Sequence, residues 1–322
     1  MHIGRQLRAL RGDRAAQRAA QIAMENTRES WLCRPDVGAM VAELGLYGAG
    51  ASWRECARLR EIASCHETAS ALVDPLIGQL CATLGIHPMG HVPFRHQLSG
   101  GTAILQLASV GRAVITLIAF DGAEQRQPAS SITFCDDERH EIVLKGAADL
   151  TIGEILSETI DRGVIDYRSR RIVEGEAMEF SEREARLIAR VHGRFVILRI
   201  ARSARNSGPS RVFRLDDGGL VHRASGDRAE SHRELAMALL GRMGRRDAAP
   251  AMAQLAREGS DHFRWQALRE CLALDAHTGF AALDRTAQDP LDPLSVPAGA
   301  LRAQLIEAYP QLSRTRVSRC QG

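Results

Sequence analysis

Apolar residues recur at helical spacing in the first third of the chain. Trp53, Cys56, Leu59 and Ile62 lie three residues apart, and Ser52 precedes them as a candidate helix N-cap. This spacing places the apolar side chains on one face of a helix. The segment from residue 34 to residue 84 is therefore predicted to be helical.

Two further signals concern the same region. The dipeptide Asp74-Pro75 predicts that a helix starts there and ends near Gly85, because proline suits the first helical position. Residues 1–30 are rich in alanine and arginine and have only a thin apolar stripe. That composition predicts a basic helical arm that either is frayed or needs a partner for its apolar face.

The period of the apolar pattern changes after residue 85. Residues 87–101 are predicted to form a loop, and from about residue 96 to residue 224 short runs rich in Val, Ile, Phe and Thr follow one another. Gly, Asp, Ser and Pro separate the runs. Short strands at regular intervals with turn signals between them are typical of an antiparallel barrel or sandwich.

Residues 231–309 return to helical spacing and contain an internal repeat. Leu239 aligns with Leu268, and Met243 aligns with Leu272, at a period of about 29 residues. The pattern resembles HEAT-like repeats, in which helix pairs stack because neither pair alone buries enough surface. The expected shared core consists of Leu239, Leu240, Met243, Leu255, Leu268, Leu272 and Leu283.

The net charge of the chain does not point to nucleic acid as a partner. Lys145 is the only lysine, so the chain is arginine-rich, yet its formal net charge is only +3 over 322 residues. Asp13, Glu25 and Glu29 also interrupt the basic arm. Both observations disfavour nucleic acid or a membrane surface as a partner.

Cysteine usage bears on the compartment. The seven cysteines are scattered and contain no CxxC pair, which fits neither a disulfide scaffold nor a zinc ribbon. A reduced, cytoplasmic protein is the simplest expectation. No apolar run approaches the roughly 18 residues needed to cross a membrane.

A strand, an acidic turn and a histidine follow one another in the segment SSITFCDDERHEIVLKG. This order resembles the second cupin motif, in which a turn presents a metal-binding histidine at the mouth of a β-barrel. The resemblance implies a barrel with His140 at its mouth. Metal-binding cupins also carry an HxH pair, and none occurs in this chain, so no cofactor is expected.

A nonstandard metal site is the alternative. A ferrous site needs about three to four His and carboxylate ligands, and His96 and Glu141 are the nearest candidates to join His140. With that set the protein would be a nonheme metal-dependent cupin oxygenase or a related enzyme, binding a divalent metal such as iron. Equally, the histidines could hydrogen-bond the backbone of a loop. No nucleophile elbow, phosphate loop or HExxH motif is present, so the catalytic residues are unknown.

Arginines recur on and between the C-terminal helices. HEAT-like arrays usually bind partners along one side, so the resemblance implies contact with a protein or peptide; a solvated polar face is the other interpretation. The candidate partner-binding residues are Arg242, Arg246, Arg264 and Arg269.

Together these patterns predict an α+β multidomain protein. We expect N-terminal helices at residues 1–90, an antiparallel cupin-like β-barrel at residues 91–228, and α-helical HEAT-like repeats at residues 229–322. The first functional hypothesis is a binding or regulatory protein, in which a metal-free barrel is coupled to an array that docks a protein or peptide.

Overall fold

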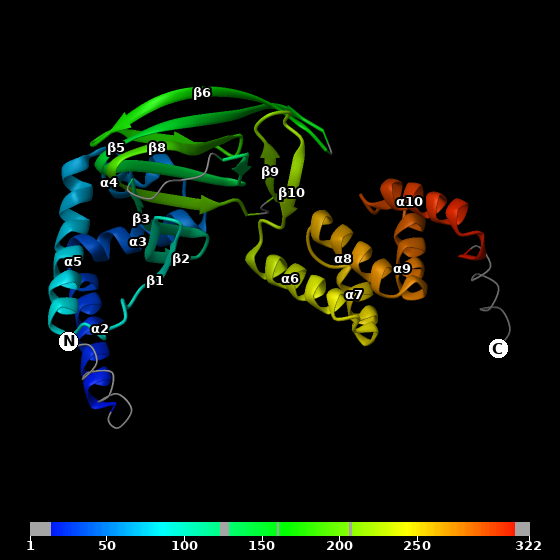
Figure 1. The fold of residues 1–322 in the computed structure, drawn as a ribbon, viewed down its shortest axis with the longest axis horizontal. Helices are drawn as coiled ribbons and strands as arrows, with labels where there is room; N and C mark the ends of the chain where they lie inside the picture. Colours follow the sequence, from blue (N-terminus) through cyan, green and yellow to red (C-terminus); the bar gives the residue numbers. More distant parts are fainter. Residues whose placement is uncertain (1–13, 123–128, 160, 206–207, 313–322) are drawn as a thin grey trace. The chain divides into compact units, whose positions relative to one another are not determined.

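The computed structural model describes residues 14–122, 129–159, 161–205 and 208–312 of the chain. The described residues form two compact units. The first contains the described residues up to Arg205 together with Arg211–His222, and the second contains residues 208–210 and 223–312. The boundary predicted at residue 90 lies inside the first unit, and the one predicted at residue 228 lies near the start of the helices of the second (Figure 1).

Four α-helices and a 3₁₀ turn begin the described part of the first unit, in agreement with the helical prediction. They are α2 (Ala15–Leu32), α3 (Pro35–Ala49), η1 (Trp53–Glu55), α4 (Ala57–Ser64) and α5 (His66–Ile86). Ser52 precedes η1 as expected, and its backbone N–H donates to Glu55 Oε2 at 2.8 Å. The arginines of the basic arm that precede residue 14 lie outside the described residues.

The prediction that a helix starts at Pro75 is wrong, because α5 continues through this residue. Proline has no N–H and leaves the carbonyl of Ala71, four residues earlier, without its helical donor. Arg34 Nη2 donates to that carbonyl at 3.1 Å instead, and Trp31 Nε1 donates to the next carbonyl, that of Leu72, at 3.0 Å. Side chains from α2 and the turn that follows it therefore donate hydrogen bonds to the carbonyls one turn before Pro75.

By length and composition α5 could also cross a membrane. Its buried side chains, which include Leu72, Leu76 and Leu80, pack into the core between the helices and the sheet.

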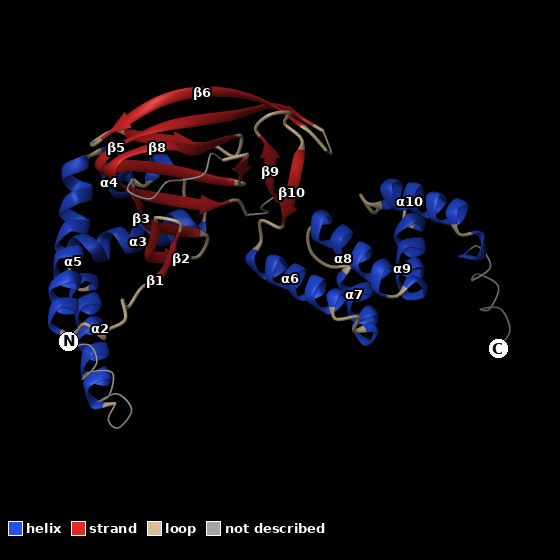
Figure 2. Cartoon of the chain, viewed as in Figure 1, coloured by secondary structure: helices blue, strands red, loops and turns tan. Residues whose placement is uncertain are grey.

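The strands of the first unit form two antiparallel sheets (Figure 2). The larger has the order β1-β2-β3-β8-β5-β6, with β7 also paired to β5, and the smaller has the order β10-β9-β4. The bounds are β1 (Arg95–Ser99), β2 (Thr102–Val110), β3 (Ala113–Asp121), β4 (Ser131–Phe134), β5 (Asp137–Glu158), β6 (Gly163–Val173), β7 (Ala177–Phe180), β8 (Glu184–Ser203), β9 (Ser210–Arg214) and β10 (Leu220–Ala224).

Two predictions about this region need correction. Within the described residues β1 and β6 lie at opposite ends of the larger sheet and do not pair, so the expected closed barrel is replaced by an open antiparallel sheet. In addition, part of the predicted loop at residues 87–101 forms β1, which pairs with β2 at the edge of the sheet. The mixed α+β class and the antiparallel strands are confirmed.

Two long strands, β5 and β8, each continue through a glycine at which the backbone bends. Gly146 in β5 and Gly193 in β8 have φ values of 83° and 78°, in the region that favours glycine. The β5–β8 register shifts on both sides of Gly146, and a Cβ there would collide with the carbonyl oxygen of Arg194. The bend brings Val143 and Leu150, from opposite sides of Gly146, into one buried cluster.

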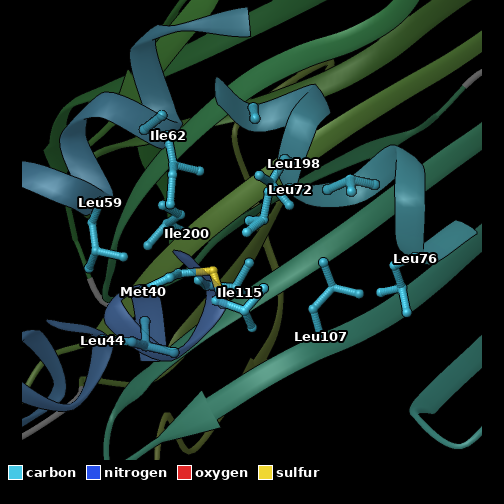
Figure 3. Close-up of a cluster of buried hydrophobic side chains, with 14 of the residues drawn as sticks. Met40, Leu44, Leu59, Ile62, Leu72, Leu76, Leu107, Ile115, Leu198 and Ile200 are labelled. Atoms are coloured by element: carbon cyan, nitrogen blue, oxygen red, sulfur yellow. The ribbon is translucent and has the colours of Figure 1, made fainter. Parts of the chain in front are cut away.

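The two faces of the larger sheet have separate cores, because side chains alternate along each strand. Leu198 and Ile200 of β8 face the helices, where they share a buried cluster with Ile62 of α4 and Leu72 of α5 (Figure 3). Ile197 belongs to the cluster on the other face, which we call the inner face. Before the bend at Gly146, residues of β5 therefore alternate between the two faces, with Ile142 on the helix-covered face and Val143 on the inner face.

The second unit consists of α6 (Arg228–Arg242), η2 (Arg246–Ala248), α7 (Ala249–Leu255), α8 (Asp261–Leu274), α9 (Ala276–Gln288) and α10 (Ser295–Ala308). Successive helices pack on one another: α6 and α7 on α8, α8 on α9, and α9 on α10. Helices at these positions were predicted, and their assignment as HEAT-like stays a prediction.

The predicted core of this unit is partly correct. Leu268 and Leu283 are buried, and the three leucines at positions 240, 255 and 272 pack against the same cluster. Leu239 and Met243 are each 59% exposed, so their placement in the core is wrong. The reason is that α6 buries Met237 and turns the opposite stripe outward.

Candidate functional site

His140 lies in β5 on the helix-covered face, where it stacks on Trp53 of η1. The ring centroids are 3.5 Å apart and the planes differ by 5°, and His140 is only 4% exposed. Its Nε2 lies 3.3 Å from Glu138 Oε1 and its Nδ1 lies 3.5 Å from Glu179 Oε1. Burial lowers the pKa of His140 and outweighs both carboxylates, so the ring is neutral near pH 7.

Glu141 follows His140 in the strand and therefore points to the inner face. It is fully buried, and its two oxygens accept from Arg186 Nε and Arg199 Nε, both at 2.6 Å. Burial alone would raise the pKa of Glu141, but the two guanidinium charges outweigh it and lower the pKa to about 2. The carboxylate is thus ionised and engaged by two charged donors.

The third candidate ligand, His96, lies on exposed β1, and its Nδ1 is 2.9 Å from the carbonyl oxygen of Phe94. The structure therefore does not bring His96, His140 and Glu141 together. Across the described ranges, no group of three or more His, Cys, Asp or Glu side chains is placed to hold a metal. The donor set that the sequence suggested does not fit a metal centre.

Alternating charges on the inner face of β5 form a ladder that the sequence analysis missed. Asp137, Arg139 and Glu141 point to the same side, and Arg139 Nε lies 3.1 Å from Asp137 Oδ1. Arg139 Nη2 donates to the carbonyl of Glu184 at 2.5 Å, and its guanidinium lies 5.4 Å from the ring centroid of Phe180. The signal was present in the sequence as acidic and basic residues alternating with a period of two.

A cavity of about 750 Å³ opens where β5 begins and β8 ends. Its wall also includes the end of α3, the residue before β3, and the turn between β7 and β8. Equal numbers of acidic and basic side chains line it: Asp136, Asp137, Glu138, Glu182, Arg112, Arg183, Arg202 and Arg205.

One wall of this cavity is anchored to the helices through Arg202. Its Nη2 donates to Glu138 Oε2 at 2.7 Å, its Nη1 donates to the carbonyl of Ala51 at 2.6 Å, and its guanidinium lies 4.1 Å from the ring centroid of Tyr47. Burial alone would raise the pKa of Glu138, but the Tyr47 hydroxyl and Arg202 outweigh it and lower that pKa. Burial raises the pKa of the adjacent Asp137, so the two neighbouring carboxyl groups are shifted in opposite directions.

A second cavity, of about 370 Å³, lies between α7, α8 and α9 in the helical unit. Of the four arginines that the sequence suggested for partner binding, Arg264 lines this cavity, whereas Arg242, Arg246 and Arg269 are exposed and do not. Arg257, which belongs to the same series of recurring arginines in the sequence, also lines the cavity. The sequence analysis missed the other charged lining residues, which are Arg285 in α9 and Asp289 and Asp292 in the loop before α10.

No protein-family model and no curated protein matches the chain. Among solved structures, CapF with an inhibitor is 6% identical, with a TM-score of 0.26 over 35% of this chain and 31% of CapF. KdgF from Halomonas sp. is 12% identical, with a TM-score of 0.25 over 35% of this chain and 88% of that one. An RmlC-like cupin from Shewanella frigidimarina is 12% identical, with a TM-score of 0.23 over 35% and 86%. Each match covers about a third of this chain.

Proposed function

We propose that the protein is a cytoplasmic binding or regulatory protein whose helical unit docks an acidic segment of a protein or peptide partner. The observation that carries the proposal is the cavity between α7, α8 and α9, with three arginines at its rim. The HEAT-like interpretation of these helices agrees with it, because such arrays present binding surfaces along their stacked helices.

The aspartates of this cavity are already engaged by the protein. Asp292 pairs with Arg264 and accepts from the backbone N–H of Leu294 at 2.9 Å, and Asp289 accepts from that of Leu291 at 3.0 Å. Both carboxylates therefore already have partners, namely Arg264 and the backbone N–H groups of the turn before α10.

The remaining two arginines are left to an incoming group. Arg257 and Arg285 are exposed, and no hydrogen bond or ion pair joins either guanidinium to another described residue. The same cavity is also lined by small buried alanines at positions 253, 256 and 282. A carboxylate can reach both guanidinium groups while its methylene stem rests on the alanines, and arginine suits this contact because it binds carboxylates in a bidentate way.

The metal-dependent oxygenase hypothesis has no comparable support. His140 is stacked in the core and Glu141 is engaged by two arginines on the opposite face of β5. Those side chains do not converge, so they do not form a site for a catalytic metal.

The test is a fluorescence-anisotropy titration of the full chain with a fluorescein-labelled hexaglutamate peptide. Replacing Arg257 and Arg285 together with alanine should weaken binding about tenfold or more, the effect of losing roughly 1.4 kcal/mol. The matched control replaces Arg54 and Arg60, two exposed arginines of the first unit, and removes the same charge. Equal weakening in both double variants would show nonspecific attraction and contradict the proposal.

A third double variant tests the residues suggested by the sequence. Replacing Arg242 and Arg269 with alanine should have little effect, because neither lines the cavity. A larger loss with this pair than with the cavity pair would move the docking surface to the outer faces of α6 and α8.

A further inference from the structure

The charged cavity of the first unit has the size of a small-molecule site. Its volume of about 750 Å³ falls within the roughly 300–1,000 Å³ typical of ligand pockets. Gly50 at the end of α3, Arg112 before β3 and Arg183 in the β7–β8 turn all reach it, although they are far apart in the sequence. Segments of the helices and the sheet therefore converge on one polar hollow.

Two arginines that line the cavity, Arg112 and Arg183, are held in place by backbone carbonyls. Arg112 Nη1 donates to the carbonyl of Ser203 at 2.6 Å. Arg183 Nε and Nη2 donate to the carbonyl of Ile155 at 2.9 and 2.6 Å, and Nη2 also donates to that of Leu156 at 2.7 Å. A guanidinium has five N–H donors, so each side chain is fixed in position and keeps donors for an incoming anion.

The lining also contains a carboxyl group, that of Asp137, whose oxygens are not fully hydrogen-bonded. Asp137 is 23% exposed at its side chain, and its Oδ1 accepts no hydrogen bond, although it lies 3.1 Å from Arg139 Nε. Burial raises the pKa of Asp137, which means that its negative charge lacks the solvation that water would give. Oδ1 itself is enclosed beside Arg139, whereas Oδ2 accepts no hydrogen bond from a described residue, so a ligand cation in the cavity would bind at Oδ2.

We propose that this cavity binds a small zwitterion with a free ammonium group and a free carboxylate, the chemistry of a short peptide or an amino acid. Asp137 receives the ammonium group, and Arg112 and Arg183 receive the carboxylate. Glu138 and Arg202 pair with each other, and the rest of the lining still holds side chains of both signs, which favours a ligand that carries both charges. This site is separate from the acidic-segment site proposed for the helical unit.

Triglycine is a suitable probe, because it carries both termini and no side chain. Saturation-transfer NMR on the full chain would compare it, at millimolar concentration, with N-acetyltriglycine, triglycinamide and the doubly blocked peptide. We expect a clear signal from triglycine, a signal reduced about tenfold or more by either block, and none from the doubly blocked form. No transfer to triglycine, or equal transfer to all four peptides, would overturn the proposal.

Two variants test which residue binds each end of the peptide. The readout is selectivity among the four peptides, which a purely structural effect would not change. In Asp137→Asn, triglycine and N-acetyltriglycine should bind equally, because the ammonium group has lost its partner. In Arg112→Gln, triglycine and triglycinamide should become more alike, and Arg54→Gln serves as the exposed control. If each variant keeps the selectivity of the native protein, Asp137 and Arg112 do not bind the two ends of the zwitterion and the proposal fails.

Discussion

The imidazole of His140 lies flat on the indole of Trp53, with ring centroids 3.5 Å apart and planes 5° from parallel. The contact joins η1 to β5, so it ties the helices to the sheet. A histidine held in this way is part of the core, and its two nearest polar partners are the carboxyl groups of Glu138 and Glu179.

Replacing His140 with alanine should therefore destabilise the protein. The change removes a buried ring and its stacking, and leaves Glu138 without one of its neighbours. The expected loss is about 2–4 kcal/mol of unfolding free energy, measured by urea denaturation. His96→Ala is the control, since this residue is exposed and its loss should stay within about 0.5 kcal/mol. A His140 variant as stable as the native protein would contradict a core role.

The same burial predicts a pH dependence. Because the pKa of His140 is lowered from its ordinary 6.5 in the folded protein, the unfolded chain binds a proton first as the pH falls. Its contribution to stability is therefore complete above about pH 6.5 and decreases below it. Glu138 and Glu179 face the same ring, so the measurement stays above about pH 5, where carboxylates are ordinarily ionised. His140→Gln should flatten the slope of unfolding free energy against pH, and an unchanged slope would refute this assignment.

Glu141→Gln should be among the most destabilising conservative changes in the chain. It leaves the buried guanidinium of Arg186 and the half-buried one of Arg199 without their counter-charge, at a cost of about 3–5 kcal/mol. Because the pKa of Glu141 is lowered to about 2, its contribution is present above its ordinary 4.5 and disappears as the pH falls toward 2. Acid unfolding of the variant should thus show a weaker dependence in this range than that of the native protein. Glu29→Gln, at an exposed position, controls for the loss of one charge.

The two bend glycines allow a matched comparison. Gly193→Ala meets no atom within 4 Å and carries only the strain of a left-handed backbone, about 1–2 kcal/mol. Gly146→Ala carries similar strain and also drives its Cβ into the Arg194 carbonyl, so it should lose clearly more stability. Equal losses in thermal or urea unfolding would mean that the β5–β8 ladder moves apart freely at the bend.

Much of the secondary structure could be predicted from the sequence, because helical and strand periods are local. The errors arise where a distant residue decides the outcome. Pro75 stays inside a helix because Arg34 replaces its missing donor, and Gly146 bends a strand rather than ending it because the second long strand follows it. Neither compensation is visible in a window of neighbouring residues.

The candidate sites were harder to predict than the fold. His140 and Glu141 were grouped because they are adjacent, but adjacency in a strand separates side chains onto opposite faces. Conversely, Arg257 and Arg285 meet at one cavity from different elements of the helical unit. Convergence of that kind depends on the packing of helices and leaves no spacing pattern in the sequence.

Charge reversal at the helical cavity tests the central claim of a docking site for acidic segments most directly. The double variant Arg257→Glu with Arg285→Glu would be titrated with labelled hexaglutamate and hexalysine peptides, beside the native protein. The native protein should prefer hexaglutamate, and the variant should lose that preference and favour hexalysine, with both effects weakening as salt is added. A variant that keeps the native preference for hexaglutamate would contradict the claim that this cavity is the docking site.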